Sequence, residues 1–297
     1  MFTVPILILG FNRPDLLVGL VNIIRDLKPT KILVAIDGPR FDVANESDLV
    51  EQCRSIVDEI DWSCEISTLF RESNLGCGQA VSKAIEWAFT IVDDLIVLED
   101  DIRPSLEFFK FCEAGLLLYK NVENVMSIGG CNSVPINGMQ KDILSAYPEI
   151  WGWATWKSKW KLYSFEMNRN ILLDLASIWR ANRFDPIASI IWTSRFFSVK
   201  YGRVDTWDYQ FVYSGFSHKQ LHLISPTNQV TNVGFDSRAT HTIFAPKAPP
   251  LIVSDESELI GEALYNKKRD KLIRKMDKEQ LLFSSKKYLS KHFKKDL

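Results

Sequence analysis

Three consecutive carboxylates, Glu99, Asp100 and Asp101, directly follow the apolar run Leu95-Ile-Val-Leu98. Adjacent carboxylates at the end of a buried strand repel one another and are costly to desolvate unless a cation lies among them. Oxygen ligands of this kind suit Mg²⁺ or Mn²⁺, which bind through one or two carboxylates, a substrate's phosphate oxygens and water. The triplet therefore favours a divalent metal site over the plain solvated turn in which acidic runs also occur.

Polar side chains also follow three other apolar runs of the chain. They are Arg13, Asp37 and Arg71, after the runs at 4–9, 31–36 and 65–69. In an open α/β sheet the ligand crevice lies outside the carboxyl ends of the strands, so the four positions predict one shared pocket. No P-loop and no GxGxxG follows the first run. Phosphates would then be held by the metal, by Arg13 and Arg71, and by helix N-termini.

Tryptophans cluster in the second half of the chain. Trp151 and Trp153 belong to a Gly-containing stretch that reads as a loop, and their rings are candidate platforms for the flat C–H faces of a sugar. Trp156 and Trp160 have helical spacing and are expected in the core.

Two later carboxylates are candidates for proton transfer. Asp208 lies between aromatic residues in Thr206-Trp-Asp-Tyr209 and is the expected general base, with Asp205 ranked second. The alternative for Asp208 is a structural role as the cap of a helix that begins near residue 209.

The order of elements predicts an α/β fold. Before residue 130, short β-branched runs alternate with amphipathic stretches, the pattern of a parallel sheet covered by helices. Strands are expected at 4–9, 31–36, 65–69, 95–98 and 125–128, and helices at 15–27, 46–60, 79–92 and 105–119. After residue 130 we expect helices at 170–182 and 186–199 and only one more buried strand, at 222–225. A Pro-rich segment at 245–250 precedes a charged helical tail.

The balance of charge argues against a nucleic-acid binder. The 297 residues are 46% hydrophobic, enough for a substantial core, and the formal net charge is −1. Residues 267–297 contain twelve Lys and Arg against four Asp and Glu, so the remaining chain carries a net charge of −9. The basic tail is interpreted either as a solvated helix that packs on the body or as a contact to an anionic membrane surface.

The cysteines and the apolar stretches indicate a location. Five cysteines without a CxxC pair favour a reducing compartment over a disulfide framework. The first apolar run is too short for a signal peptide, and no stretch approaches the 18 or so apolar residues of a membrane span. We therefore expect a cytoplasmic protein, and under the membrane interpretation of the tail it would be peripheral on the inner face of the membrane.

Taken together, these residues resemble a GT-A fold nucleotide-sugar glycosyltransferase over about residues 3–245. The similarity is carried by Gly10-Phe-Asn-Arg-Pro14, Ile36-Asp-Gly-Pro39, Asn74-Leu-Gly-Cys-Gly-Gln79 and Leu98-Glu-Asp-Asp101. More narrowly, the segment 99–109 is similar to the Glu-Asp-Asp form of the Asp-x-Asp motif in the N-acetylglucosaminyltransferase I group. The Trp151-Gly-Trp-Ala-Thr-Trp156 and Thr206-Trp-Asp-Tyr209 segments resemble the acceptor-side and base segments of its bacterial relatives.

The resemblance implies a role for each matching residue. Asp37 would accept from the uracil N–H, Arg13 would lie near the nucleotide, and Asp100 would face the donor ribose or sugar. Asp101 would bind Mn²⁺ or Mg²⁺, and Asp208 would be the base. Further nucleotide-sugar contacts are expected from Arg71, Asn74, Glu99, Trp151 and Trp153. GT-A enzymes commonly carry a late loop that closes over the donor, which here implies Arg238 at the diphosphate and His241 at the metal.

The implied protein is an inverting, metal-dependent glycosyltransferase. It would move a sugar such as N-acetylglucosamine from a UDP-sugar to a hydroxyl of a glycan or lipid-linked glycan, in bacterial surface polysaccharide synthesis. Residues 1–130 would be the nucleotide-sugar half of the domain, 131–248 the acceptor and catalytic half, and 249–297 the basic tail. The alternatives are a metal-dependent phosphohydrolase or nucleotidyltransferase on a similar sheet, and an inactive glycan-binding relative.

Overall fold

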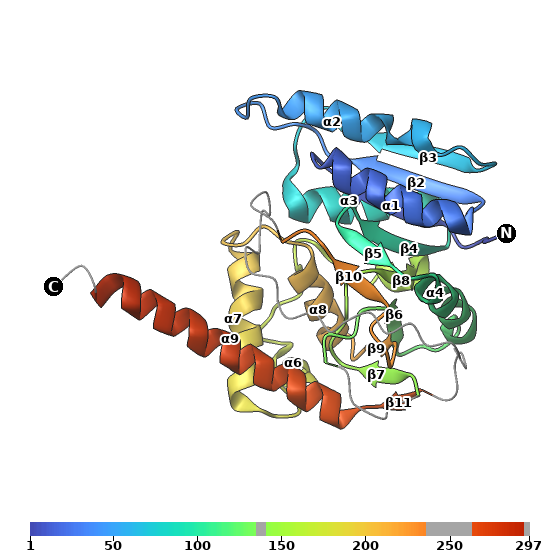
Figure 1. Cartoon of the computed structure of the whole chain (residues 1–297). Helices are drawn as coiled ribbons and strands as arrows, with labels where there is room; N and C mark the ends of the chain where they lie inside the picture. Colours follow the sequence, from blue (N-terminus) through green and yellow to red (C-terminus); the bar gives the residue numbers. More distant parts are fainter. Residues whose placement is uncertain (135–140, 236–262, 294–297) are drawn as a thin grey trace.

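The computed structural model describes residues 1–134, 141–235 and 263–293, with backbone alone for 282–293 (Figure 1). Arg238 and His241 lie outside the described residues, as do the Pro-rich segment and most of the expected late loop. None of the described helices is both long enough and apolar enough to cross a bilayer.

The first half of the chain alternates strands and helices as its pattern predicts. The strands are β1 (Ile6–Gly10), β2 (Lys31–Ile36), β3 (Glu65–Phe70), β4 (Asp94–Glu99), β5 (Ile102–Pro104) and β6 (Val125–Gly129). The helices are α1 (Pro14–Leu27), α2 (Glu46–Arg54), η1 (Ser55–Glu59, a 3₁₀ helix), α3 (Gly76–Ile91) and α4 (Leu106–Tyr119). Pro14 opens α1 with its φ already suited to a helix, and the Ser105 hydroxyl caps α4 by accepting from Phe108 N at 3.4 Å.

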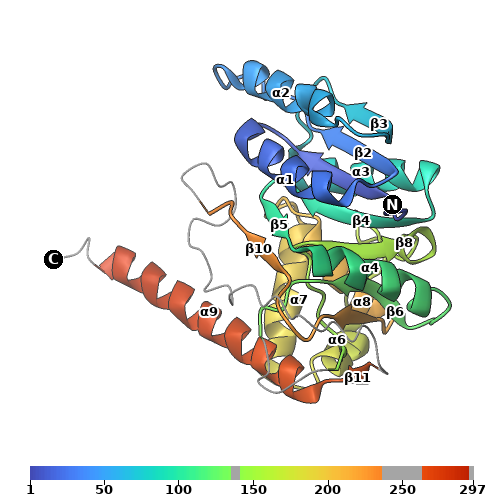
Figure 2. The same cartoon turned by 45° about the vertical axis from the view of Figure 1, so that its right-hand side comes forward.

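In the described part of the chain, nine strands form one sheet in the order β11-β7-β9-β6-β8-β4-β1-β2-β3 (Figures 1 and 2). Strands β3, β2, β1 and β4 are parallel neighbours, so their carboxyl ends share one edge. Because β8 lies between β4 and β6, the sheet interleaves strands from residues 1–130 with strands from 131–248. Helices cover both faces: α1 and α4 pack in one apolar cluster, and α3 and α8 pack in another.

The expectation of a single strand after residue 130 was wrong. Besides β9 (Leu221–Ile224), the chain forms β7 (Ile143–Ser145), β8 (Trp153–Trp156), β10 (Val230–Asn232) and β11 (Leu264–Tyr265). Three of these strands have only two or three residues, too few for a period to show. All four residues of β8 are buried, so it has no polar alternation, and it follows a glycine that reads as a loop.

The later helices build an aromatic layer beside the sheet. They are α5 (Lys157–Trp160), α6 (Leu175–Ala181), α7 (Pro186–Lys200), α8 (Asp208–Ser217) and α9 (Lys267–Phe293). One core cluster joins side chains of α6, α7 and α8. Trp160 is buried, as expected, and stacks on Tyr163 with ring centroids 4.3 Å apart. The predicted fold class is confirmed: an α/β fold with a mostly parallel, helix-flanked sheet and a helical C-terminal tail.

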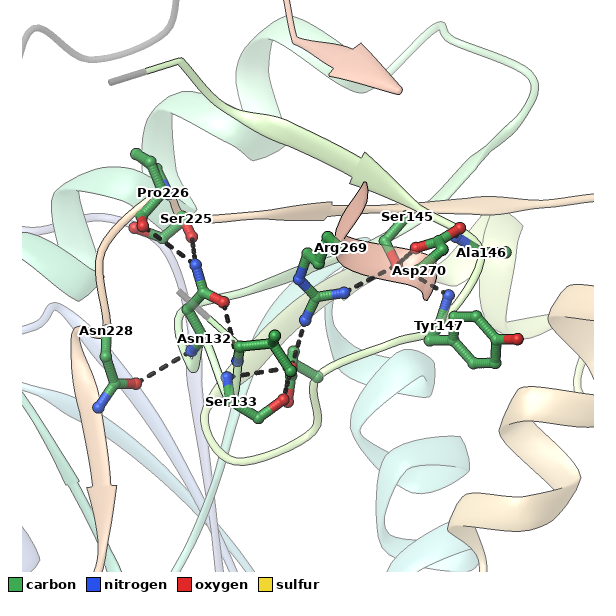
Figure 3. Close-up of polar contacts among 12 residues, drawn as sticks. Asn132, Ser133, Ser145, Ala146, Tyr147, Ser225, Pro226, Asn228, Arg269 and Asp270 are labelled. Atoms are coloured by element: carbon green, nitrogen blue, oxygen red, sulfur yellow. Dashed lines mark hydrogen bonds and ion pairs between the residues drawn. The ribbon is translucent and has the colours of Figure 1, made fainter. Parts of the chain in front are cut away.

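The basic tail begins as an integral part of the body. Arg269 and Asp270 of α9 are fully buried, and the Arg269 guanidinium pairs with the Glu149 carboxylate and donates to Ser145 Oγ at 2.8 Å (Figure 3). The Ser145 hydroxyl in turn donates to Asp270 at 2.7 Å. The helix therefore docks here through charged side chains, while Lys267, Lys268 and others point to solvent.

Candidate functional site

The carboxyl ends of β1, β2 and β4 open on a cleft of about 380 Å³. Its position between β1 and β4 is where helical connections diverge to the two faces of the sheet, the usual ligand position in such folds. The cleft brings together five of the predicted residues with several others. Its polar lining includes Asn12, Arg13, Asp37, Arg40, Asn74, Glu99, Asp100 and Asp205.

One guanidinium joins the acidic triplet. Arg13 Nη2 lies 2.7 Å from Asp100 Oδ1 and 3.0 Å from Asp101 Oδ2. The antiparallel pairing of β5 with β10 brings Asn232 beside the triplet, where its amide donates to Asp101 Oδ1 at 3.3 Å. Gly234 passes so close that a Cβ would lie 2.1 Å from Asp101 Oδ2, so this position excludes a side chain. The triplet is thus bound on one side by Arg13, which follows β1, and on the other by Asn232 of β10.

The triplet carries more negative charge than Arg13 neutralises. Burial raises the pKa of Asp100 to about 7, although the Arg13 charge opposes the shift. Burial, followed by the charges of Asp101, Asp100 and Asp208, raises the pKa of Glu99 to about 8. The Arg103 charge also opposes the shift of Asp100, and a further positive charge beside the triplet would favour the ionised carboxylates.

The donor set fits a divalent cation only in part. Among the described residues, no three His, Cys, Asp or Glu side chains are close enough together to hold a metal by themselves. A hard cation would therefore take Asp101 as its protein ligand and complete its shell with phosphate oxygens and water, as Mg²⁺ commonly does. The side chain of Asp101 is 13% exposed, so solvent and ligands can reach it.

A second polar pair lies across the cleft. Asp37 Oδ2 accepts from Asn74 Nδ2 at 3.0 Å and from the Leu75 N–H at 3.1 Å. Burial raises the pKa of Asp37, although these backbone N–H bonds and the Arg71 charge oppose the shift. Gly38 permits the close approach, because a Cβ there would lie 2.4 Å from the Ser73 backbone. The pair lies at the N-terminus of α3, which favours negative ligand groups.

The two candidate bases lie at different places. Asp205 lines the cleft, and its Oδ1 accepts from Gly78 N in the first turn of α3 at 3.1 Å. Asp208 begins α8, and its Oδ1 accepts from Tyr209 N at 2.7 Å and from the Thr206 hydroxyl. Asp208 does not line the cleft, but its charge acts on Glu99 and Cys77, which do and are half-buried. Its Oδ2 has no hydrogen-bond partner among the described residues.

The two tryptophans of the expected loop have different environments. Trp153 is only 1% exposed in β8 and stacks on Trp207 with ring centroids 5.4 Å apart. The expectation that Trp153 contacts a sugar is therefore corrected to a core role, because neither ring face is open. Trp151 is partly buried and meets Phe235 edge to face at 5.6 Å.

Arg71 also differs from its expected place. It does not line the cleft, and burial lowers its pKa, although the Asp37 charge opposes this. Arg71 therefore influences the cleft through the effect of its charge on Asp37.

An ion pair between buried Glu46 and half-exposed Arg40 at the cleft rim escaped sequence reasoning. Glu46 is 1% exposed and accepts from Asn12 Nδ2 at 2.9 Å and from the Arg40 N–H at 2.7 Å. Arg40 pairs with Glu46 and lies 5.6 Å above the Phe11 ring. Asn12 could have been recognised, because it directly follows the first strand. Arg40 and Glu46 could not, because they belong to a polar stretch that has the pattern of an ordinary loop and the start of a helix.

The comparisons with known proteins show no family. No family model matches the chain, and no curated protein matches it. It is similar to solved structures of HddC from Yersinia pseudotuberculosis, with a TM-score of 0.27 and 17% identity over 39% of this chain and 55% of that one. It is also similar to S. aureus TarS 1-349, with a TM-score of 0.39 and 13% identity over 57% and 52%.

A third solved structure is 4-diphosphocytidyl-2C-methyl-D-erythritol synthase from Anaerococcus prevotii. It has a TM-score of 0.36 and 10% identity over 75% of this chain and 87% of that one. The chain thus spans about half the length of HddC and of the TarS fragment.

Proposed function

We propose that this chain is an inverting, metal-dependent glycosyltransferase that moves a sugar from a UDP-sugar to a hydroxyl of a glycan acceptor. The sugar is of the N-acetylglucosamine kind, and the acceptor is a glycan or lipid-linked glycan of a bacterial surface polysaccharide. One observation carries the proposal: Arg13, the Asp100 carboxylate that it binds and the Asp37–Asn74 pair line the same cleft.

The Asp37 end of the cleft suits a nucleobase. Its carboxylate already collects N–H donors from Asn74 and Leu75, so the uracil N–H adds one more donor to a built acceptor site. The N-terminus of α3 and the Arg13 guanidinium then lie toward the phosphates, where their positive charge is favourable. Glu99 and Asp100 line the stretch between, where the ribose and sugar hydroxyls would bind.

Asp101 is the residue that would hold the metal. When bound, Mn²⁺ or Mg²⁺ would neutralise the charge that develops on the departing diphosphate. Arg13 would also help to neutralise the diphosphate charge, because its guanidinium lies within hydrogen-bond distance of Asp101. Arg238 and His241 are proposed to act at the diphosphate and the metal, from the segment outside the described residues.

Asp208 is the proposed general base. Tyr209 N and the Thr206 hydroxyl fix its Oδ1, which leaves Oδ2 for the proton of the acceptor hydroxyl. Asp205 is the second candidate, because it lines the cleft directly. Trp151 is the remaining aromatic candidate for the acceptor, since its ring is partly exposed.

Transfer is tested by incubating the protein with Mn²⁺ and a panel of nucleotide sugars and identifying the nucleotide released. A glycosyltransferase releases the nucleoside diphosphate, whereas a phosphohydrolase gives the monophosphate and a nucleotidyltransferase needs pyrophosphate and gives the triphosphate. Asp208→Asn should keep nucleotide-dependent thermal stabilisation and lose release, and Asp101→Ala should lose both. Asp93→Asn, an exposed carboxylate before β4, is the matched control. The proposal fails if no nucleotide sugar stabilises the wild type.

A further inference from the structure

Helix α7 is apolar on two faces, only one of which is buried. Ala188, Trp192 and Phe196 pack inward. A second row, which we call the α7 stripe, consists of Ile187, Ile190, Phe197 and Tyr201, spaced by three, seven and four residues along one side of the helix. Ile187 is 51% exposed, Ile190 63% and Tyr201 67%, and Phe197 stacks on Tyr201 with ring centroids 6.0 Å apart.

The turn before α7 adds a further exposed ring. Phe184 is 66% exposed, and both Arg183 and Phe184 have positive φ, at 56° and 59°. Left-handed backbone is costly for residues other than glycine, so two in succession need a compensating contact. Phe184 N donates to Trp179 O at 2.7 Å, which closes the end of α6 and holds the ring outward.

The chain segment that carries the α7 stripe is rich in cations. Residues 180–204 contain five Lys and Arg and one acidic residue, Asp185. Asp185 is neutralised by Lys278 at 2.6 Å, and Arg195 is paired with Asp277 at 2.7 Å. The other four cations form no ion pair with a carboxylate of the described residues: Arg180, Arg183, Lys200 and Arg203.

Apolar side chains beside cations that lack a carboxylate partner are the composition of a helix that lies in the headgroup region of an anionic membrane. A second copy of the chain is a poorer occupant, because two such faces would bring like charges together. Tyr201 also lies only four residues before Asp205, which lines the cleft, so a surface bound along α7 would approach the cleft mouth.

We propose that the α7 stripe and its four cations dock on an anionic lipid bilayer, so that a lipid-linked acceptor meets the cleft from the α7 side. The membrane contact itself does not depend on catalysis, whereas the statement that it brings a lipid-linked acceptor to the cleft rests on the proposed function. It also differs from a contact made by the basic tail alone, since the stripe belongs to the folded body.

Vesicle co-sedimentation at low and high salt tests the proposal. The vesicles contain phosphatidylcholine alone or with an equal amount of phosphatidylglycerol. The wild type should bind only the anionic vesicles, and Ile187→Ser/Ile190→Ser should weaken binding about tenfold. Leu117→Ser/Leu118→Ser, two exposed leucines of α4, should bind as the wild type does. A tail variant, Lys268→Gln/Lys271→Gln/Lys275→Gln, should retain more binding than the α7 variant.

Each other outcome overturns the proposal. It fails if the wild type does not bind anionic vesicles, or if the tail variant loses binding while the α7 variant keeps it. It also fails if analytical ultracentrifugation shows a dimeric wild type and a monomeric α7 variant while the two proteins bind lipid equally. Circular dichroism melting of each variant separates a lost contact from a lost fold. Nucleotide release, measured separately without lipid, reports on the proposed function.

Discussion

At the scale of single residues, the site is a balance between one guanidinium and three carboxylates. Position in the sequence was enough to place Glu99, Asp100 and Asp101 at a strand's end beside Arg13, because parallel strands share their carboxyl edge. Sequence position could not predict the hydrogen bond from Asn232 to Asp101, because that contact depends on the pairing of β5 with β10 across more than a hundred residues.

The raised pKa values of Asp100 and Glu99 predict a pH-dependent stability. Both lie above the usual acid range, at about 7 and about 8, so the native state holds protons that the unfolded chain releases. Metal-free protein should therefore be most stable below about pH 4 with respect to these groups and should lose stability as pH rises to about 8. Thermal melts in EDTA from pH 5 to 9 measure this slope. Asp100→Asn should flatten it, and an unchanged slope in that variant would refute the assignment.

The Asp37–Asn74 pair predicts a separable loss of nucleotide affinity. Asn74→Ala removes one donor to Asp37 and one acceptor from Gly76 N, so stability should fall by about 1 kcal/mol. Affinity for UDP should fall about tenfold, because the carboxylate loses its orientation. Calorimetric titration and melting measure the two effects. Asn168→Ala, which changes an exposed amide that does not line the cleft, is the control, and equal UDP affinity in both variants would contradict the role of Asn74.

At the scale of elements, the sequence was informative where a strand is a short run of branched apolar residues between amphipathic helices. The residues of β2 are the predicted ones, and β1, β3, β4 and β6 differ from prediction by one or two residues at an end. Strand β8 was missed because tryptophan, alanine and threonine in four buried positions resemble neither a β-branched run nor an alternation. Because β8 was missed, Trp153 was predicted to lie in a loop and contact a sugar, whereas it packs in the core.

The docking of α9 predicts a strong effect from one buried ion pair. Arg269 is fully buried against Glu149 and Ser145, so Arg269→Met leaves the Glu149 carboxylate without its charged partner. Unfolding free energy should fall by about 3–5 kcal/mol, as for other broken buried pairs. Lys268→Met, the exposed neighbour, should change it by less than about 0.5 kcal/mol. Urea denaturation measures both, and equal stability of the two variants would show that the pair does not dock the helix.

At the scale of the whole molecule, the nearly neutral total charge conceals an uneven distribution. An acidic body and a basic C-terminal segment were predicted from composition, but composition did not show that Arg269, Asp270, Arg274 and Asp277 are buried. Charged residues are seldom buried unless paired, so a run of them reads as a solvated face. Cations are also frequent over residues 180–204, where the sequence pattern predicted only a helix at 186–199.

The central claim is that one cleft holds a nucleoside diphosphate through a metal on Asp101. Calorimetric titration of UDP into the wild type, Asp101→Asn and Asp93→Asn, each with Mn²⁺ and with EDTA, tests it most directly. UDP should bind the wild type and Asp93→Asn only with Mn²⁺, and at least about tenfold more weakly to Asp101→Asn. Binding of UDP to Asp101→Asn with unchanged affinity, or no binding to the wild type in Mn²⁺, would contradict the claim.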